Sequence, residues 1–275
     1  MVSWMSKLST HHHTDDGSRN GVKVPRGIGK LSSLHTLGVI DISAAGNEDV
    51  LEDLKNLTQL HKLGVSGINW NNSKRFFSAI SRLYLLESLS LQVQLGEDDN
   101  QAGCLDNMPA RRITAEYDPR KKRTMQKLTS LKLYGFVRTL PEWTSKLENI
   151  RKLSLQMTLL PQEGLDILQR LVKLRSLRLF LSEFQDDKLV GGFRLDFLEI
   201  SCNSRLQATI AFGSSYLRRS SVRVLRIRCW HVASLRTSGL QHVGDLKEVW
   251  LSGPCDKAHR QHFESELAKY PESLF

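Results

Sequence analysis

The amino-acid sequence predicts an α/β fold in which short parallel strands stack side by side, with irregular or helical segments between them. The first observation is an apolar pattern, L-x-x-L-x-x-L-x-L/V, in "LSSLHTLGV" from Leu31, "LTQLHKLGV" from Leu57 and "LYLLESLSL" from Leu83. The second is its regular spacing, because these three starting leucines are 26 residues apart both times. A repeated unit of constant length indicates a solenoid in place of a single closed core.

The pattern continues along most of the chain. It returns as "MQKLTSLKL" from Met125, "LENIRKLSL" from Leu147 and "LVKLRSLRL" from Leu171, with weaker copies over 195–200, 222–227 and 243–251. Alignment on the second-last apolar residue gives steps of 26, 26, 42, 22, 24, 21, 27 and 24 residues between Leu37, Leu63, Leu89, Leu131, Leu153, Leu177, Leu198, Leu225 and Val249. All steps but the third lie in or beside the roughly 20–29 residue period of leucine-rich repeats.

The final L-x-L/V of each copy alternates with period two, which predicts a short strand with one buried face. No repeat can bury its apolar residues alone, so neighbouring repeats stack. The sequence therefore predicts a leucine-rich-repeat solenoid, or horseshoe, with a concave parallel β-sheet and an irregular or helical convex side, in about nine to ten repeats over residues 22–255.

A glycine-rich stretch, Gly27-Ile28-Gly29-Lys30, resembles a phosphate-binding loop. That loop requires G-x-x-x-x-G-K followed by Ser or Thr. Here Val24 stands five residues before Gly29, and Leu31 follows Lys30, so two required positions fail. The stretch "VPRGIGKL" aligns instead with "LPEWTSKL" at 140–147, which predicts a turn into the first repeat with Val24 and Ile28 in the core, Gly27 and Gly29 as bends, and Lys30 in solvent.

The 42-residue step leaves two alternatives for residues 95–124. Forty-two is twice 21, so a degenerate repeat with a strand near "RRITAEY" (111–117) fits the length. The other alternative is an exposed insertion on one face. We favour a degenerate strand beside an exposed charged loop.

The two ends differ. Residues 1–21 are expected to be a disordered segment, and because no repeat precedes Val22 the first repeat reads as part of something longer. Residues 256–275 are expected to form a capping helix, begun by Asp256, ended by Pro271, and buried through Phe263, Leu267 and Tyr270. A partner-docking helix is the alternative for this segment.

Composition excludes several classes. The chain has 275 residues, a formal net charge of +10 and four cysteines. No run approaches the roughly 20 apolar residues that a membrane span needs, and the first residues have no apolar core of a secretory signal. These features predict a cytoplasmic protein, with a nuclear location as a further option, and no disulfides.

Four stretches resemble the C-terminal repeats of plant intracellular disease-resistance receptors, of the cereal coiled-coil, nucleotide-binding, leucine-rich-repeat type: "VPRGIGKLSSLHTL", "LPEWTSKLENIRKLSL", "LYGFVRTLPEW" and "GLQHVGDLKEVWL". The resemblance covers about residues 22–260. It implies a sensor surface that binds a pathogen effector or a guarded host protein and restrains a nucleotide-switch domain. That domain has no counterpart in this chain, so no cofactor is expected.

The residues that flank each buried strand pair are expected to face the concave side. Later strands place arginines and aromatic residues there, which are enriched at interface anchors. The expected partner-binding residues are Lys132, Tyr134, Lys152, Gln156, Arg178, Phe180, Glu199, Arg226, Arg228 and Trp250. Arg178, Glu199, Arg226 and Trp250 are expected to form one continuous patch, since adjacent strands lie about 4.8 Å apart.

No other motif in the sequence predicts a catalytic or metal site. The histidines at 11–13 and the pair His259 and His262 lack cysteines at zinc-finger spacing. Cys202 and Cys229 share a register position, where packing is favoured over a disulfide. The basic run 120–123 leaves nucleic-acid binding open as an alternative, beside a stand-alone repeat adaptor of the substrate-recognition type. The sequence therefore predicts a non-catalytic protein-binding module with no catalytic residue and no metal.

Overall fold

The computed structural model describes residues 21–43, 48–94, 99–108, 125–183, 193–203, 208–212, 221–230, 235–254 and 257–269. The chain divides into two compact units. The N-terminal unit consists of Asp15–Gln156 and Asp166–Lys173. The C-terminal unit consists of Met157–Leu165 and Leu174–Phe275, together with Met1–Thr14.

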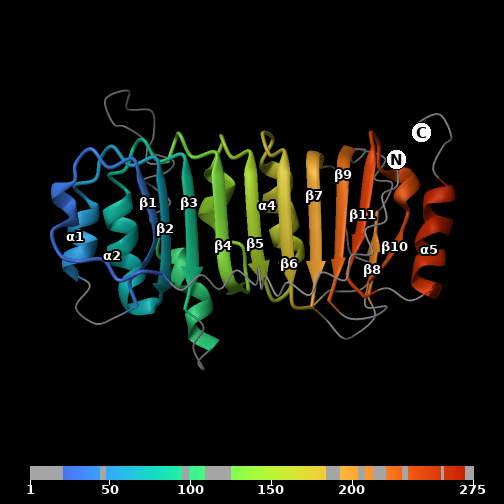
Figure 1. Cartoon of the computed structure of the whole chain (residues 1–275), viewed down its shortest axis with the longest axis horizontal. Coiled ribbons are helices and arrows are strands. Elements are labelled where there is room, and N and C mark those ends of the chain that lie inside the picture. The colour runs from blue at the N-terminus through green and yellow to red at the C-terminus, as the bar shows by residue number, and fades with distance from the viewer. Residues whose placement is uncertain are drawn as a thin grey trace. The chain divides into compact units, whose positions relative to one another are not determined.

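The N-terminal unit contains a parallel sheet in which each repeat contributes one strand (Figure 1). Its neighbouring strands are, in order, β1 (Thr36–Asp41), β2 (Lys62–Ile68), β3 (Ser88–Val93), β4 (Ser130–Val137) and β5 (Lys152–Met157). Leu63, Leu89 and Leu131 share one register row and are buried, as the repeat pattern predicts. The leucine ladder is thus the core of this unit.

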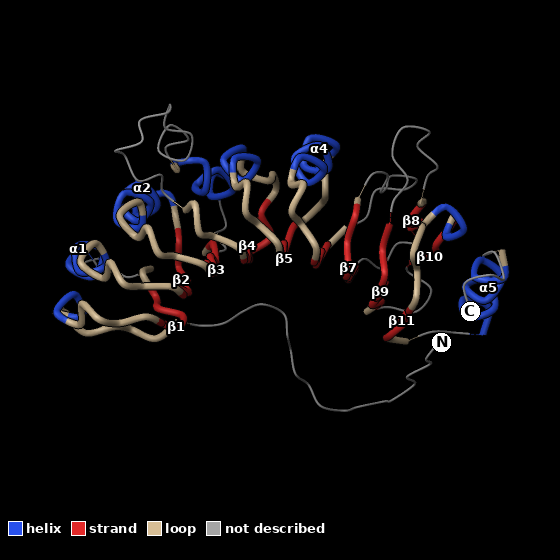
Figure 2. Tube along the Cα trace, turned by 90° about the horizontal axis from the view of Figure 1, so that it is seen from above, coloured by secondary structure: helices blue, strands red, loops and turns tan. Residues whose placement is uncertain are grey.

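Helices of the N-terminal unit lie on one side of the strands (Figure 2). They are α1 (Glu48–Leu54), α2 (Trp70–Ile80) and the 3-10 helices η1 (Ile28–Lys30), η2 (Asp99–Asn107) and η3 (Glu142–Lys146). Helix α2 begins where the Asn69 side chain accepts the backbone N–H of Asn72, whose own side chain accepts the Asn69 N–H. This capping box satisfies two N–H groups that a helix start leaves open, while Phe76 and Phe77 bury the apolar face.

The first strand departs from the expected register. Leu37 stands opposite Leu63, but Val39 stands opposite Gly64, so Gly38 is an extra residue in β1. A bulge of this kind moves every later side chain to the other face of the sheet. Ile40 flanks the apolar pair Leu37 and Val39, so the sequence pattern predicts it on the concave side; the bulge places it opposite Val65, and it is buried.

The glycine-rich stretch forms a turn and the short helix η1, the counterpart of η3 in "LPEWTSKL". Gly27 has a φ of 89°, in the left-handed region that favours glycine. A Cβ on Gly29 would lie 2.9 Å from the backbone oxygen of Asp53, so Gly29 permits close packing. Lys30 is exposed, as expected, but Val24 and Ile28 are only partly buried, and Val22 forms an isolated parallel bridge with Ile40 of β1.

The segment between β3 and β4 contributes no strand between them, because these two strands pair directly with each other. Its described part, η2, contacts α2 and η3. Asn107 Nδ2 donates to Ser73 Oγ over 2.8 Å, and Trp143 Nε1 donates to the Leu105 carbonyl over 2.8 Å. Residues 109–124, which include the expected strand at 111–117 and the basic run 120–123, lie outside the described residues.

The C-terminal unit contains four neighbouring strands, β6 (Ser176–Leu181), β7 (Arg194–Cys202), β9 (Ser221–Cys229) and β11 (Glu248–Ser252). All three pairings are parallel. A second parallel pair consists of β8 (Ala208–Ala211) and β10 (Leu235–Ser238), followed by η4 (Leu240–His242). Helix α4 (Gln162–Arg170) contains residues of both units.

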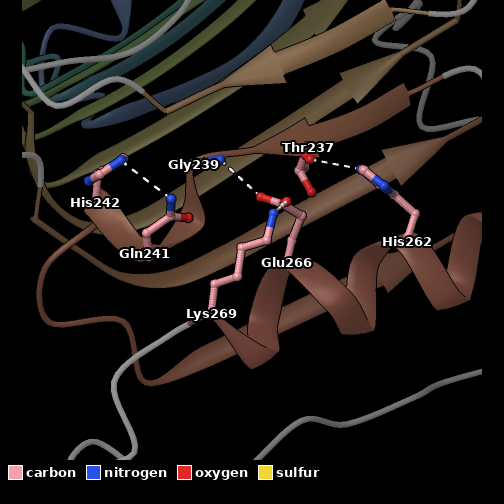
Figure 3. A network of polar contacts seen from close by, with 7 residues as sticks. All are labelled: Thr237, Gly239, Gln241, His242, His262, Glu266 and Lys269. Carbon is pink, nitrogen blue, oxygen red and sulfur yellow. Dashed lines mark hydrogen bonds and ion pairs between the residues drawn. The ribbon is translucent and has the colours of Figure 1, made fainter.

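The last helix, α5 (Lys257–Ala268), packs against β10 and η4 through Phe263 and Leu267, two of the three residues expected to anchor it. Polar contacts also join α5 to β10 and to Gly239, the residue before η4 (Figure 3). The buried Glu266 accepts the Gly239 backbone N–H over 2.9 Å and pairs with Lys269, and His262 Nε2 lies 2.9 Å from the Thr237 carbonyl. Tyr270 and Asp256 lie outside the described residues.

Candidate functional site

A row of polar and aromatic side chains crosses the sheet of the C-terminal unit. Arg178 on β6 stands opposite Glu199 on β7, Glu199 stands opposite Arg226 on β9, and Arg226 stands opposite Trp250 on β11. The strand register thus places these four residues in one row across neighbouring strands. With Phe197 and Arg228, which contact these residues, we call the set the arginine–aromatic row: Arg178, Phe197, Glu199, Arg226, Arg228 and Trp250.

Glu199 is the buried centre of the row. Its side chain is only 5% exposed, although it lies on the polar face of the sheet. Arg178 Nε lies 3.3 Å from one carboxylate oxygen, and an Nη atom of Arg228 lies 3.9 Å from the other. A buried carboxylate needs such partners, because an unpaired charge away from water is costly. Glu199 therefore acts as the anchor of two arginines and is not itself accessible to a partner.

Arg226 makes contacts of a different kind. Its guanidinium carbon lies 5.6 Å from the ring centre of Phe197 and 5.6 Å from that of Trp250. The guanidinium carbon of Arg178 also lies over the Phe197 ring, 5.4 Å from its centre. Distances below about 6 Å are those of cation–π interactions. The Trp250 ring is held in turn by its Nε1, which donates to Glu248 over 3.1 Å.

The other expected site residues differ in how far they are exposed to solvent. Phe180 is half-buried on β6, Lys132 and Tyr134 are half-buried on β4, and Lys152 is exposed on β5. Gln156 is a correction: it is only 8% exposed, and its Oε1 accepts the Gly135 backbone N–H over 2.9 Å. Gly135 lies within β4 and has a φ of 98°, so the buried amide of Gln156 holds this left-handed position of the neighbouring strand and is not available to a partner.

Sequence reasoning left two contributors out of the candidate site, Phe197 and Glu248. Phe197 is the ring shared by Arg178 and Arg226, and Glu248 fixes the Trp250 indole. Each lies two residues before a chosen position, Glu199 or Trp250, and therefore on the same strand face. The register alone was a sufficient signal for including them.

The pKa values of Cys104 and Asp106, both in η2, are raised. Burial, with a contribution from the Asp106 charge, raises the pKa of the Cys104 thiol to about 11. Burial, with the nearby Glu142 charge, also raises the pKa of Asp106. A thiol of this kind stays protonated near neutral pH, which makes it a poor nucleophile.

The histidines and cysteines considered for metal or disulfide chemistry are placed as follows. Among the residues that the structure describes, no group of three or more His, Cys, Asp or Glu is placed to hold a metal ion. His262 is engaged with Thr237, and residues 11–13 are not described. Cys202 is buried and stands opposite Cys229 in the strand register.

Comparison with protein families identifies the repeats. A model of the leucine-rich repeat region matches residues 13–270, nearly the whole chain. The chain belongs to this family. The parallel sheet and its leucine ladder are thus the framework of a leucine-rich repeat region.

This leucine-rich repeat region is distantly similar to rice proteins. It is 32% identical over 177 residues to the disease resistance protein PIK6-NP of Oryza sativa subsp. japonica, covering 61% of this chain and 15% of that protein. It is 31% identical over 155 residues to the rice disease resistance protein Pik-2, covering 55% of this chain and 14% of that protein. The chain thus spans about one seventh of the length of the relatives that it matches.

Solved structures with similar chain paths share little sequence with it. An internalin C2 from Listeria monocytogenes has a TM-score of 0.40 and 19% identity, covering 84% of this chain and 77% of that one. The TLR13–ssRNA13 complex has a TM-score of 0.47 and 18% identity, covering 88% of this chain and 39% of that one. Within the described residues, none of the helices has the length and apolar character that crossing a membrane requires.

Proposed function

We propose that this leucine-rich repeat region is a non-catalytic protein-interaction module, comparable to the sensor and autoinhibitory repeats of a plant disease-resistance receptor. Its partner would be a pathogen effector, a guarded host protein or a nucleotide-switch domain. The similarity to rice disease resistance proteins supports this class of function. The proposal places the protein in the cytoplasm, where that class of receptor acts.

The arginine–aromatic row is the observation that carries the proposal. Arg and Trp are the residue types most enriched among the few residues that dominate binding energy. Here Arg226 and Trp250 lie side by side in the strand register and contact each other. Both are partly exposed, so the pair can be reached from solvent. A rigid pair of this kind loses little conformational entropy when a partner binds.

The test is a comparison of matched double variants with a purified partner. Partners are first co-purified from plant leaf extract with and without infection and identified by mass. Each is then purified, and its affinity is measured for the parent chain and for a variant with Arg226→Ala and Trp250→Ala. We expect a loss of about 100-fold, since two anchor residues are removed.

The control carries Arg82→Ala and Trp70→Ala, which remove the same residue types from exposed positions of the N-terminal unit. We expect its affinity to stay within about 3-fold of the parent. Equal affinity of all three proteins for every purified partner would refute binding through the arginine–aromatic row.

A further inference from the structure

We infer that Arg226 is the receptor for a carboxylate, an Asp or Glu side chain, on an acidic protein segment that docks on the arginine–aromatic row. This inference rests on the proposed protein-binding function and names the chemistry of the partner. It follows from how the three arginines of the row divide their contacts.

Arg178 and Arg228 both face the buried carboxylate of Glu199. Arg226 stands directly opposite Glu199 in the strand register but does not pair with it. Among the residues that the structure describes, no acidic side chain forms an ion pair with Arg226, and no hydrogen bond of its guanidinium group is present. Of the three, Arg226 is therefore the arginine whose donors are open to an added acceptor.

The aromatic contacts hold the guanidinium group of Arg226 between strands β7 and β11. A guanidinium carries its five N–H donors in one planar fork. Phe197 and Trp250 each lie 5.6 Å from its carbon, and Glu248 holds the Trp250 ring through the indole N–H. Such a pre-oriented planar fork matches a carboxylate with two parallel N–H···O bonds.

The local charges favour an isolated carboxylate over a nucleic acid. The surface combines three arginines, Arg178, Arg226 and Arg228, with two carboxylates, Glu199 and Glu248. Nucleic-acid sites neutralise several successive phosphates with free Lys or Arg. Arg178 and Arg228 share the one negative charge of Glu199, and the exposed Glu248 stands beside Trp250, so these five charged groups sum to only +1. One open guanidinium fits one acidic side chain.

The experiment uses a library of random short peptides displayed on phage and selected against the whole chain. Peptides whose binding is lost in a Trp250→Ala variant define ligands of the row. We expect each of them to contain an Asp or Glu whose change to Asn or Gln weakens binding to the parent at least about 10-fold. Against Arg226→Gln, the same peptide change should cost less than about 2-fold, because the pair is already broken.

Two further variants guard against loss of folding. Arg226→Lys keeps the charge but not the planar fork, so its affinity should fall between those of the parent and Arg226→Gln. Arg82→Gln removes one exposed arginine from the N-terminal unit and should bind every selected peptide as the parent does. Thermal unfolding of each variant shows that it is folded.

The outcomes separate the two proposals. Two results overturn the carboxylate pairing and leave protein binding intact. One is a set of row-binding peptides that contain no acidic residue. The other is an Asp→Asn or Glu→Gln change in the peptide that weakens binding to Arg226→Gln as much as binding to the parent. Selected peptides that all bind Trp250→Ala like the parent overturn the proposed function, and the pairing with it. A thymidine oligonucleotide is tested in the same way. If it binds the parent more tightly than any selected peptide does, and Arg226→Gln abolishes that binding, the pairing is overturned in favour of nucleic acid.

Discussion

The backbone N–H of Gly27 donates to the side-chain carboxylate of Asp53 over 2.6 Å. The stretch that resembles a phosphate loop thus offers its amide to an anion of its own chain, at the end of α1. A carboxylate takes the role that a phosphate would have in a nucleotide-binding protein. The glycines shape this contact: Gly27 has a left-handed backbone, and Gly29 lies against Asp53.

We expect Asp53→Ala to lower the free energy of unfolding by about 1 kcal/mol, the typical cost of leaving a partly buried N–H without its acceptor. The matched control is Asp49→Ala on the same helix, where the carboxylate pairs with Arg26 at the exposed surface. That change should stay within about 0.5 kcal/mol. Urea denaturation measures both, and equal effects would contradict the role of Asp53.

We expect Glu199→Gln to lower the free energy of unfolding by about 1–3 kcal/mol, because Arg178 and Arg228 lose their shared negative partner. The figure lies below that for a fully buried pair, since the Arg178 side chain is 47% exposed. Asp196→Asn on the same strand is the control, because its pair with Arg223 is exposed on both sides. A loss no larger than that of Asp196→Asn would show that Glu199 is not an anchor.

We expect Trp143→Phe to lower the free energy of unfolding by about 1–2 kcal/mol. The phenyl ring retains the aromatic contact with Phe77, but the indole N–H that satisfies the Leu105 carbonyl is gone. Trp70→Phe, at a residue that is 56% exposed, is the control and should have little effect. If both variants unfold at the same denaturant concentration as the parent, η2 does not depend on this hydrogen bond.

We expect Glu266→Ala to speed amide exchange in α5 about 10-fold, through local opening of this helix. The buried carboxylate holds the Gly239 N–H and Lys269 together, as Figure 3 shows. Glu264→Ala, at an exposed position of the same helix, is the control. Hydrogen exchange followed by mass spectrometry over 257–269 measures both. Equal protection in the two variants would exclude a role of Glu266 in docking.

Cys104 predicts a loss of stability at alkaline pH. Its pKa is about 11 in the folded protein, above the ordinary 9.0. The unfolded chain therefore releases this proton first, so the contribution is complete below pH 9.0 and is lost as the pH rises toward 11. The whole loss is roughly 2–3 kcal/mol.

Comparison with Cys104→Ala isolates this effect from other groups that titrate at high pH. We expect the stability difference between parent and variant to shrink between about pH 8 and about pH 10, because alanine has no proton to release. Denaturant titrations at the two pH values measure it. A difference that stays constant would mean that the thiol ionises alike in both states.

The sequence alone was sufficient to predict the repeat framework, because the position of each leucine in the ladder follows from an apolar pattern only a few residues long. The register marks Leu63, Leu89 and Leu131 align in the sheet, and so do Arg178, Glu199 and Arg226. A two-residue period on parallel strands also determines which side chains share a face. The same local reasoning was wrong at Ile40, since a bulge at Gly38 has no signature in the apolar pattern.

Only the tertiary structure decided which side chains on that face are available. Sequence placed Gln156, Glu199 and Arg226 on the same face of the sheet, but Gln156 accepts the Gly135 N–H, Glu199 is buried, and Arg226 lies between two rings. These differences depend on side-chain directions across neighbouring strands, which contribute residues 20 or more positions apart in the chain. A period read along one strand carries no information about which of two neighbouring arginines a carboxylate will choose.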